Sequence, residues 1–274
     1  MKTEHAQQEL FQTVGNQIFL DVSHAVVVNQ GSSLRGANTI PDHRIYAVTA
    51  TDGVGGTIRN LADGMCLDLT AGGIYFMPGM QPLEYSFESG LCMTAFHFRA
   101  TLGRGVDLFH GQARFACTAD RPELAQEMRC ALEGAARPGA MVRGRAILME
   151  MVAGFMAHST VELRRLQALH ARYAPLFERI DEACTARLRV SELAACMHIT
   201  PSALARNFRR DVGTSVKAVI SQRLVQRASQ ELLLSDRSIK EIAYALEFAN
   251  EFYFSRFFKR HTHTSPSAFR NAYR

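Results

Sequence analysis

The sequence predicts an α+β protein of two domains, a strand-rich N-terminal domain followed by an all-helical C-terminal domain. Three observations support this. Short β-rich runs separated by glycine and proline fill residues 15–100, a helical period of apolar residues begins after residue 120, and one helical phrase occurs twice in the last hundred residues. The 274 residues are long enough to bury two cores. We expect domains at 1–167 and 178–274, joined by a linker at 168–177.

The first hundred residues read as short strands rich in β-branched and aromatic residues. Turn signals such as Gly36, Asp52-Gly53, Gly55-Gly56 and Pro78-Gly79 separate them. Many short strands at this spacing are typical of a sandwich or a small barrel. The expected strands are Ile18–Leu20, His24–Val28, Arg44–Ala50, Gly73–Met77, Leu83–Phe87 and Leu91–Phe98.

Two helices are expected after the strands. Pro122 suits the first position of a helix that runs to about Glu133, and a second helix extends from about Met141 to beyond Leu163. The second carries a wide apolar stripe, which either packs against the strands or serves as a dimer face. The stripe consists of Ile147, Leu148, Met151, Val152, Phe155 and Met156.

The helical phrase in the last hundred residues is duplicated with a displacement of 49 to 50 positions. Leu193-Ala194 corresponds to Ile242-Ala243, and Arg206 corresponds to Arg256. Each copy fits a short helix, a tight turn and a longer second helix, which is the arrangement of a helix-turn-helix unit. Thr200-Pro201 is a strong helix-start signal, and a helix over about 216–234 joins the two copies. Two such units on one domain fit successive turns of a DNA major groove.

The exposed face of each second helix carries the residues that would contact DNA. Arginine matches the two major-groove acceptors of guanine, so Arg206 and Arg256 are expected to read bases. Basic residues at the helix ends are expected to bind phosphates without reading sequence. The candidate base contacts are Ser202, Ala205, Arg206, Glu251, Phe252, Ser255 and Arg256, and the candidate phosphate contacts are Arg209, Arg210, Lys259 and Arg260. Tyr253, Phe254, Phe257 and Phe258 are expected to face mostly inward.

The positive charge of the chain belongs to the repeat region. Residues 175–274 hold 16 Lys or Arg against 10 Asp or Glu, whereas the first 174 residues hold 15 against 16. This asymmetry favours attraction of the C-terminal domain to nucleic-acid phosphates.

The repeat region resembles the AraC/XylS family of bacterial transcription regulators. The resemblance covers about 178–272 and is clearest in Ser238–Ala243, Phe252–Arg260 and Ser265–Arg270. It implies a dimeric regulator of double-stranded DNA, an activator rather than a repressor, that contacts RNA polymerase. The sequence departs from the family at glycines replaced by His198, Glu247 and His263. A positive φ there costs a non-glycine residue about 1 kcal/mol or more, so we expect slightly different turns.

The N-terminal domain is similar to the cupin-like β-barrel of that family, followed by its helical dimerisation pair. The similarity rests on Leu69–Gly79 and Ala95–Phe98 and implies a small-molecule effector, such as a sugar or related metabolite, inside the barrel. Met93 and Ala95 occupy two positions of the arabinose pocket, which disfavours arabinose itself. Polar and aromatic strand residues suit either an effector cavity or an ordinary core. The candidate effector contacts are His43, Tyr46, Tyr85, Met93 and His97.

Other chemistry is disfavoured. The six cysteines form no C-x-x-C pair, and no H-x-H pair occurs in the strand region, so we expect neither a disulfide framework nor a metal site or other cofactor. No apolar segment approaches a membrane span, and a cytoplasmic protein is expected. Two alternatives stay open: an N-terminal domain that only dimerises or binds a protein partner, and a cupin-like enzyme fused to a DNA-binding module.

Overall fold

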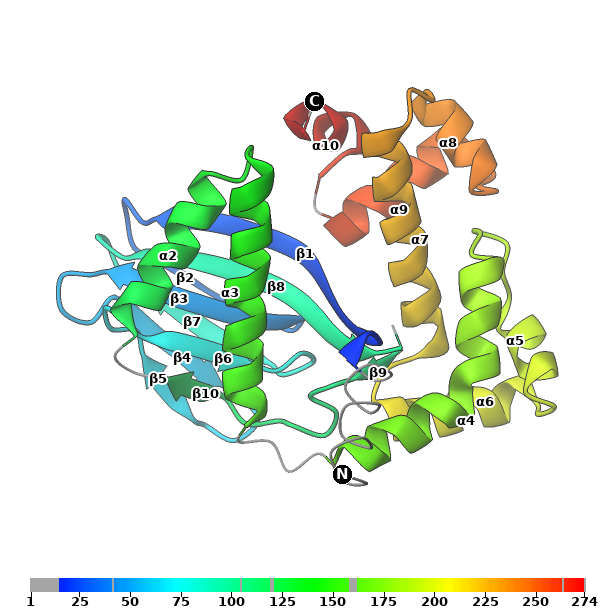
Figure 1. Cartoon of the computed structure of the whole chain (residues 1–274), viewed down its shortest axis with the longest axis horizontal. Helices are drawn as coiled ribbons and strands as arrows, with labels where there is room; N and C mark the ends of the chain where they lie inside the picture. The colour runs from blue at the N-terminus through cyan, green and yellow to red at the C-terminus, as the bar shows by residue number, and fades with distance from the viewer. Residues whose placement is uncertain are drawn as a thin grey trace, which may run out of the picture. The chain divides into compact units, whose positions relative to one another are not determined.

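The computed structural model describes residues 15–40, 42–103, 105–118, 121–157, 162–262 and 264–273. The chain divides into two compact units (Figure 1). The strand-rich unit comprises Ile18–Thr101 and Gly111–Val161, and the helical unit comprises Glu162–Arg274 together with Met1–Gln17 and Leu102–His110.

The strands form two hydrogen-bonded sheets that do not close into one barrel, so the predicted cupin-like β-barrel is confirmed only as a strand-rich domain. The first sheet has the order β1-β8-β3-β6-β10, with β9 paired to β8, and the second has the order β2-β7-β4-β5. The first contains β1 (Ile18–Asn29), β3 (His43–Ala50), β6 (Ile74–Met77), β8 (Cys92–Leu102), β9 (Val106–Asp107) and β10 (Ala116–Thr118). The second contains β2 (Leu34–Asn38), β4 (Gly56–Asn60), β5 (Cys66–Asp68) and β7 (Leu83–Phe87).

Alternation along the strands separates two apolar layers. In β3, Tyr46 and Val48 join the cluster buried between the sheets, which also contains Leu83 and Phe87 of β7. The opposite face of the first sheet packs against α3, where Phe76 stacks on Phe155 with ring centroids 5.2 Å apart.

The two helices after the strands are α2 (Pro122–Glu133) and α3 (Pro138–Met156), which lie side by side in Figure 1. The predicted bounds of α2 are confirmed, while α3 begins three residues early and ends at Met156, and residues 158–161 lie outside the described part. Ile147, Leu148, Met151, Val152 and Phe155 are all buried within their own unit. The apolar stripe therefore packs against the strands of its own unit, which is the first of the two interpretations.

The helical unit contains two short helix pairs connected by a long helix. α7 (Val216–Leu234) runs between the pair α5–α6 and the pair α8–α9 in Figure 1, and its predicted bounds are confirmed. The remaining helices are α4 (Leu163–Glu182), α5 (Val190–Cys196), α6 (Pro201–Val212), α8 (Ile239–Ala245), α9 (Glu251–Thr262) and α10 (Pro266–Tyr273).

The segment 168–177, expected to be a linker, is part of α4. Tyr173, Leu176 and Phe177 are buried in the helical unit, so the segment forms a packed amphipathic helix. Phe177 also packs closely on Gly105, where a β-carbon would come within 2.1 Å of its ring. The alternative that Leu163 to Tyr173 is helical agrees with the structure, and α4 continues through Pro175 because buried aromatic and apolar residues flank it on both sides.

Candidate nucleic-acid interface and effector site

The first helix pair, α5 and α6, has the tight geometry of a helix-turn-helix unit. Leu193 and Ala194 of α5 are buried, as are Leu204 and Phe208 of α6. The turn closes through a hydrogen bond from the Ile199 amide to the Ala194 carbonyl at 3.0 Å. At the start of α6 the Thr200 hydroxyl accepts a hydrogen bond from the Ala203 amide at 3.2 Å, which confirms the predicted helix start.

The second pair, α8 and α9, repeats the first in detail. Ile242 and Ala243 are buried, and the Phe248 amide donates to the Ala243 carbonyl at 2.9 Å, the bond that corresponds to Ile199–Ala194. The Asn250 side chain accepts a hydrogen bond from the Tyr253 amide at 2.9 Å at the start of α9. The duplication in sequence is therefore a duplication of local structure.

Both turns contain a non-glycine residue in the left-handed region. His198 has φ 53° and Glu247 has φ 58°. Both residues therefore adopt the positive φ that glycine favours, at a conformational cost for a residue with a side chain. His263, the third departure, lies outside the described residues.

The outer faces of α6 and α9 carry the candidate base contacts. Ser202, Ala205 and Arg206 are exposed on α6, and Phe252 and Arg256 are exposed on α9. Phe252 is 75% exposed, which is unusual for a phenylalanine in a packed domain. Glu251 and Ser255 are half-buried at the edge of the same face. In the described part of the chain, neither Arg206 nor Arg256 has an ion pair, so both guanidinium groups are available to a ligand.

The aromatic residues of α9 divide differently from the prediction. Phe254 and Phe258 are fully buried as expected, and Phe257 is half-buried against Phe248 with ring centroids 5.2 Å apart. Tyr253, however, is 65% exposed. It follows Phe252 by 100° around the helix, which leaves it on the outer side of the inward-facing row.

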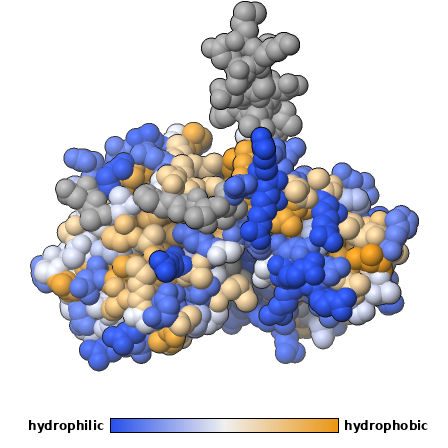
Figure 2. All heavy atoms as spheres, turned by 90° about the horizontal axis from the view of Figure 1, so that it is seen from below, coloured by the Kyte–Doolittle hydropathy of each residue, from blue (hydrophilic) through white to orange (hydrophobic). Residues whose placement is uncertain are grey.

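The four candidate phosphate contacts are all exposed, but two of them have partners. Arg209 and Lys259 have no ion pair with a described residue. Arg210 pairs with Asp211 at 2.8 Å, and the Arg260 guanidinium lies 6.0 Å from the ring centre of Phe257. Figure 2 shows strongly hydrophilic residues gathered on the side of the helical unit seen in that view.

A polar cluster fixes α6 to α4. Tyr173 of α4 donates to the Asp211 carboxylate at 2.8 Å, and Arg172 contacts the same carboxylate at 3.1 Å. Burial, with the hydrogen bond to Asp211 and its charge, raises the pKa of Tyr173 to about 12. Burial would raise the pKa of Asp211, but hydrogen bonds from Arg210 and Tyr173 and the two arginine charges outweigh it, and that pKa is lowered.

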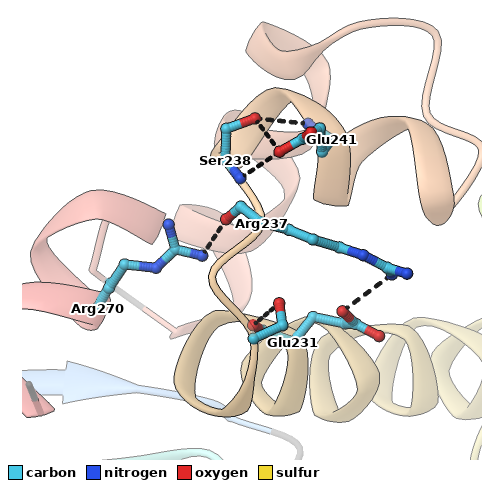
Figure 3. A network of polar contacts seen from close by, with 6 residues as sticks. Glu231, Arg237, Ser238, Glu241 and Arg270 are labelled. Atoms are coloured by element: carbon cyan, nitrogen blue, oxygen red, sulfur yellow. Dashed lines mark hydrogen bonds and ion pairs between the residues drawn. The ribbon is translucent and has the colours of Figure 1, made fainter.

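A second polar cluster fixes the start of α8 (Figure 3). Ser238 and Glu241 form a capping box, in which the Glu241 carboxylate accepts from the Ser238 amide at 2.7 Å. Arg270 of α10 donates to the Arg237 carbonyl at 2.7 Å and to the Leu232 carbonyl at 3.1 Å. The second helix-turn-helix unit is thus fastened to the end of α7.

Three of the five candidate effector contacts lie between the two sheets. Tyr46, Met93 and Tyr85 face the same layer, and the rings of Tyr46 and Tyr85 both contact Phe87, with centroids 6.0 and 4.9 Å away. Tyr46 and Met93 are buried, whereas Tyr85 is half-buried.

The two histidines are placed differently. His43 faces the opposite side of the first sheet, packs between Phe76 and Phe98 with centroids 5.7 and 5.6 Å away, and accepts a hydrogen bond from the Gly79 amide at 2.9 Å. It is a core histidine because strand alternation separates it from Tyr46. His97 pairs in register with Arg44 and lies 5.1 Å from the His24 ring.

Arg44, which lies in β3 two residues before Tyr46, was not among the predicted contacts. This arginine is only 2% exposed, and burial lowers its pKa. Its Nη2 donates to the Asn38 side chain of the second sheet at 2.8 Å. An arginine at an inward-facing strand position was the signal that could have identified it.

The described residues contain no group of three or more His, Cys, Asp or Glu side chains placed to hold a metal ion. None of the described helices is long and apolar enough to cross a membrane.

Comparisons with known proteins agree with this geometry. Residues 193–272 match a family described as a helix-turn-helix domain. The chain is 34% identical over 120 residues to the arabinose operon regulatory protein of Escherichia coli (strain K12), covering 39% of this chain and 40% of the relative. It is 32% identical over 93 residues to the bifunctional transcriptional activator/DNA repair enzyme AdaA of Bacillus subtilis (strain 168), covering 34% of this chain and 44% of the relative. The chain thus spans less than half the length of these curated relatives.

Solved structures are also similar over nearly the whole chain. A crystal structure of ToxT from Vibrio cholerae O395 matches with a TM-score of 0.52 and 12% identity, covering 94% of this chain and 98% of that one. At this identity the similarity concerns the fold alone. It extends beyond the helical unit to the strand-rich unit.

Proposed function

We propose that the chain is a transcription regulator of the AraC/XylS family, which reads a specific double-stranded DNA site with α6 and α9 and is controlled by a small effector bound between its sheets. The observation that carries the proposal is the matched pair of outward arginines, Arg206 and Arg256, on structurally duplicated helices.

The spacing of the two helix pairs supports simultaneous contact with DNA. α7 has 19 residues, which at 1.5 Å per residue gives a length of about 28 Å. Successive major-groove faces on one side of B-DNA are separated by roughly 34 Å. A single rigid helix therefore holds the two units at a distance that suits neighbouring turns of the groove.

Base reading is assigned to Arg206 and Arg256, with Ser202, Ala205, Glu251, Phe252 and Ser255 beside them. The guanidinium fork fits the two acceptors of guanine, and exposed Phe252 can contact a thymine methyl group. Arg209 and Lys259 are assigned to phosphates, as are Arg210 and Arg260 where their internal contacts permit.

The test compares base reading with phosphate binding. Purified protein first selects its preferred site from random DNA fragments. Arg256→Ala is expected to weaken binding to that site by about 1–3 kcal/mol and to relax the base preference at one position. Arg260→Ala is expected to weaken all DNA similarly and to reduce the salt dependence of binding. Arg59→Ala, which removes an exposed arginine of the strand-rich unit, is the control. Equal losses on selected and random DNA in Arg256→Ala would contradict base reading.

Effector control is proposed for the layer between the sheets, where Tyr46, Tyr85 and Met93 lie together. Such control requires the effector to bind two conformations of the protein with different affinity. An effector at 100 times its dissociation constant is expected to stabilise the protein by about 2.7 kcal/mol, which thermal denaturation detects. No stabilisation by any small compound would favour an N-terminal unit that only dimerises or binds a protein.

Dimerisation is proposed through α3. Its N-terminal end exposes Met141 by 62% and Val142 by 70%, which is apolar area that a second copy of the chain can cover. Met141→Glu with Val142→Lys is expected to lower the molecular mass measured by light scattering to that of one chain. An unchanged mass would place any dimer contact elsewhere. An activating contact with RNA polymerase remains a proposal that rests on the family alone.

A further inference from the structure

Arg44 is a buried cation with an unsatisfied donor. The residue is 2% exposed, and within the described residues only its Nη2 has a hydrogen-bond partner, the neutral Asn38 side chain at 2.8 Å. The Nη1 atom is buried and makes no hydrogen bond within the described part of the chain. A buried guanidinium normally faces a carboxylate, because its charge is costly to remove from water.

No carboxylate among the described residues compensates Arg44 directly. Asp42 is the nearby acidic residue, but its carboxylate accepts hydrogen bonds from Arg99 at 2.9 Å and from Ser23 at 2.5 Å. No ion pair joins Arg44 to Asp42 or to another described carboxylate. The positive charge is therefore available to an anion that comes from outside the chain.

Two tyrosine hydroxyls lie near the same place. Tyr46 follows Arg44 by two residues and shares its face of β3, while Tyr85 pairs in register with Gly36, two residues before Asn38 on β2. Neither hydroxyl has a hydrogen bond to a described residue. The Phe87 ring contacts both tyrosine rings, so the two hydroxyl groups lie beside an aromatic surface.

The pKa directions agree with this geometry. Burial raises the pKa of Tyr46 and lowers that of Arg44, in each case because the low-dielectric layer disfavours the charged form. In such a layer a charge-assisted hydrogen bond is stronger than in water. A carboxylate can accept two parallel hydrogen bonds from the arginine fork, which a neutral hydroxyl cannot do.

We propose that the effector is an organic monocarboxylate, whose carboxylate pairs with Arg44 and whose apolar body packs against Tyr46, Tyr85 and Phe87. This inference rests on the proposed effector site and names the chemical class that it takes. It replaces the neutral sugar expected from the sequence with an acidic compound.

The Arg44–Asn38 hydrogen bond lies at the edge of the second sheet, and we place the entry of the ligand on this side. β2 is an edge strand, Asn38 at its end is exposed, and Tyr85 beside it is half-buried. The Arg44–Asn38 hydrogen bond joins the two sheets at this point, so the ligand would exchange a neutral partner of the guanidinium for a charged one.

The experiment uses the full chain and matched pairs of probes. Phenylacetate and hexanoate, and the neutral amide of each, are titrated into the protein by isothermal calorimetry. Concentrations up to 10 mM allow dissociation constants of about 1 mM to be measured. For at least one pair, we expect the acid to bind at least about tenfold more tightly than the amide, because only the acid forms the charge-assisted pair with arginine. Equal binding of acid and amide, or no binding of any acid, would overturn the proposal.

Variants locate the charge. Arg44→Met keeps the length of the buried side chain and is expected to abolish the preference for the acid, whereas Arg59→Met, at an exposed position of β4, should keep it. Circular dichroism checks that each variant is folded. Arg44→Lys covers the case in which methionine prevents folding, because it keeps the charge without the fork and should reduce the preference without abolishing it. An unchanged preference in Arg44→Met or in Arg44→Lys would contradict the assignment.

The failure of this inference is distinguishable from failure of effector control. Neutral sugars could instead stabilise the protein through Tyr46 and Tyr85, with no effect of Arg44→Met. That result would support the effector site but contradict the proposal that its ligand is a carboxylate. If no acid, amide or sugar binds at all, the effector site falls as well. Affinity for the selected DNA, measured on the same samples, tests the helix-turn-helix assignment independently of both.

Discussion

At the residue scale, His198 and Glu247 show how packing imposes an unfavourable backbone conformation. Both turns need a left-handed residue at the same place, and both have a side chain where glycine would fit without strain. The packing of apolar pairs such as Phe248 and Phe254, whose ring centroids are 5.2 Å apart, offsets the free-energy cost of this conformation. The strain thus lies next to the candidate DNA-binding helices.

Relief of this strain is the first prediction. His198→Gly and Glu247→Gly are each expected to stabilise the protein by about 0.5–1 kcal/mol, because the left-handed penalty of about 1–2 kcal/mol exceeds the added backbone entropy of unfolded glycine. Chemical denaturation measures this change. The control is Gln230→Gly in the middle of α7, where glycine should destabilise by about 1 kcal/mol. Destabilisation at both turns would show that these side chains contribute contacts worth more than the strain.

Single residues also mark the limit of what the sequence predicts about the sites. Arg206 and Arg256 were found because their spacing repeats and their helix faces follow from a period of 3.6. His43 and Arg44 are neighbours that face opposite layers, so the choice between them needed the strand register. Composition favoured the histidine as a ligand contact, whereas the register points to the arginine.

At the element scale, a helix or strand was predicted accurately where its own residues carry clear periodicity and clear end signals. The bounds of α7 were predicted because apolar periodicity fills it and polar breaks flank it. β2 and β4 were missed, since Gly36 and Gly56 were interpreted as turn signals. Gly36 in fact lies within a strand, where its missing side chain leaves room for the Tyr85 hydroxyl, which a β-carbon would approach to 2.4 Å.

The contact between α4 and α6 leads to a prediction at high pH. Because the folded-state pKa of Tyr173 is raised to about 12, its stabilising contribution is complete below the unfolded value near 10 and is lost as pH rises between about 10 and 12. The loss should not exceed about 1.4 kcal/mol per pH unit. Tyr173→Phe should remove this part of the pH dependence, which urea denaturation across that window measures.

The matched control for Tyr173 is Tyr253→Phe. Tyr253 is exposed on α9, so its removal should leave the alkaline slope of the wild type unchanged. A wild-type slope that persists in Tyr173→Phe would assign the alkaline sensitivity to other groups.

The start of α8 gives a second prediction for a single element. Ser238→Ala removes the hydroxyl that caps the Glu241 amide at 3.2 Å, and should destabilise the helical unit by about 1 kcal/mol. Ser238→Asp retains a capping oxygen and should recover most of that stability. Because Glu241 has its pKa lowered by hydrogen bonds from Ser238, the capping contribution should decline as pH falls towards the carboxylate range. Equal stability of the alanine and aspartate variants would show that the capping box contributes little.

At the scale of the whole molecule, the charge and composition of the two units agree with the proposed roles of DNA binding and effector binding. The excess of basic residues lies in 175–274, the part that carries both helix pairs, while the strand-rich unit holds the buried arginine and tyrosines. The segment Leu102–His110 belongs to the helical unit although its first residue is the last residue of β8. Gly103 and Gly105 permit this close approach to His170 and Phe177 of α4. β8 thus continues into a segment that contacts α4, the first helix of the helical unit. Composition alone does not reveal this connection.

The rigid connection through α7 gives the last prediction, which changes the DNA and leaves the protein intact. If α7 holds the helix pairs at one separation, they can occupy only half-sites with the natural spacing. Inserting five base pairs between the half-sites places them on opposite faces, and inserting ten restores the face but adds roughly 34 Å. Both insertions should lower affinity by at least about tenfold, to that of a single helix pair. Flexible attachment would instead let the ten-base-pair insertion recover affinity, because only the face would then matter. Gel-shift titration of the three DNAs, with Arg206→Ala and Arg256→Ala showing which half-site each pair occupies, separates these outcomes.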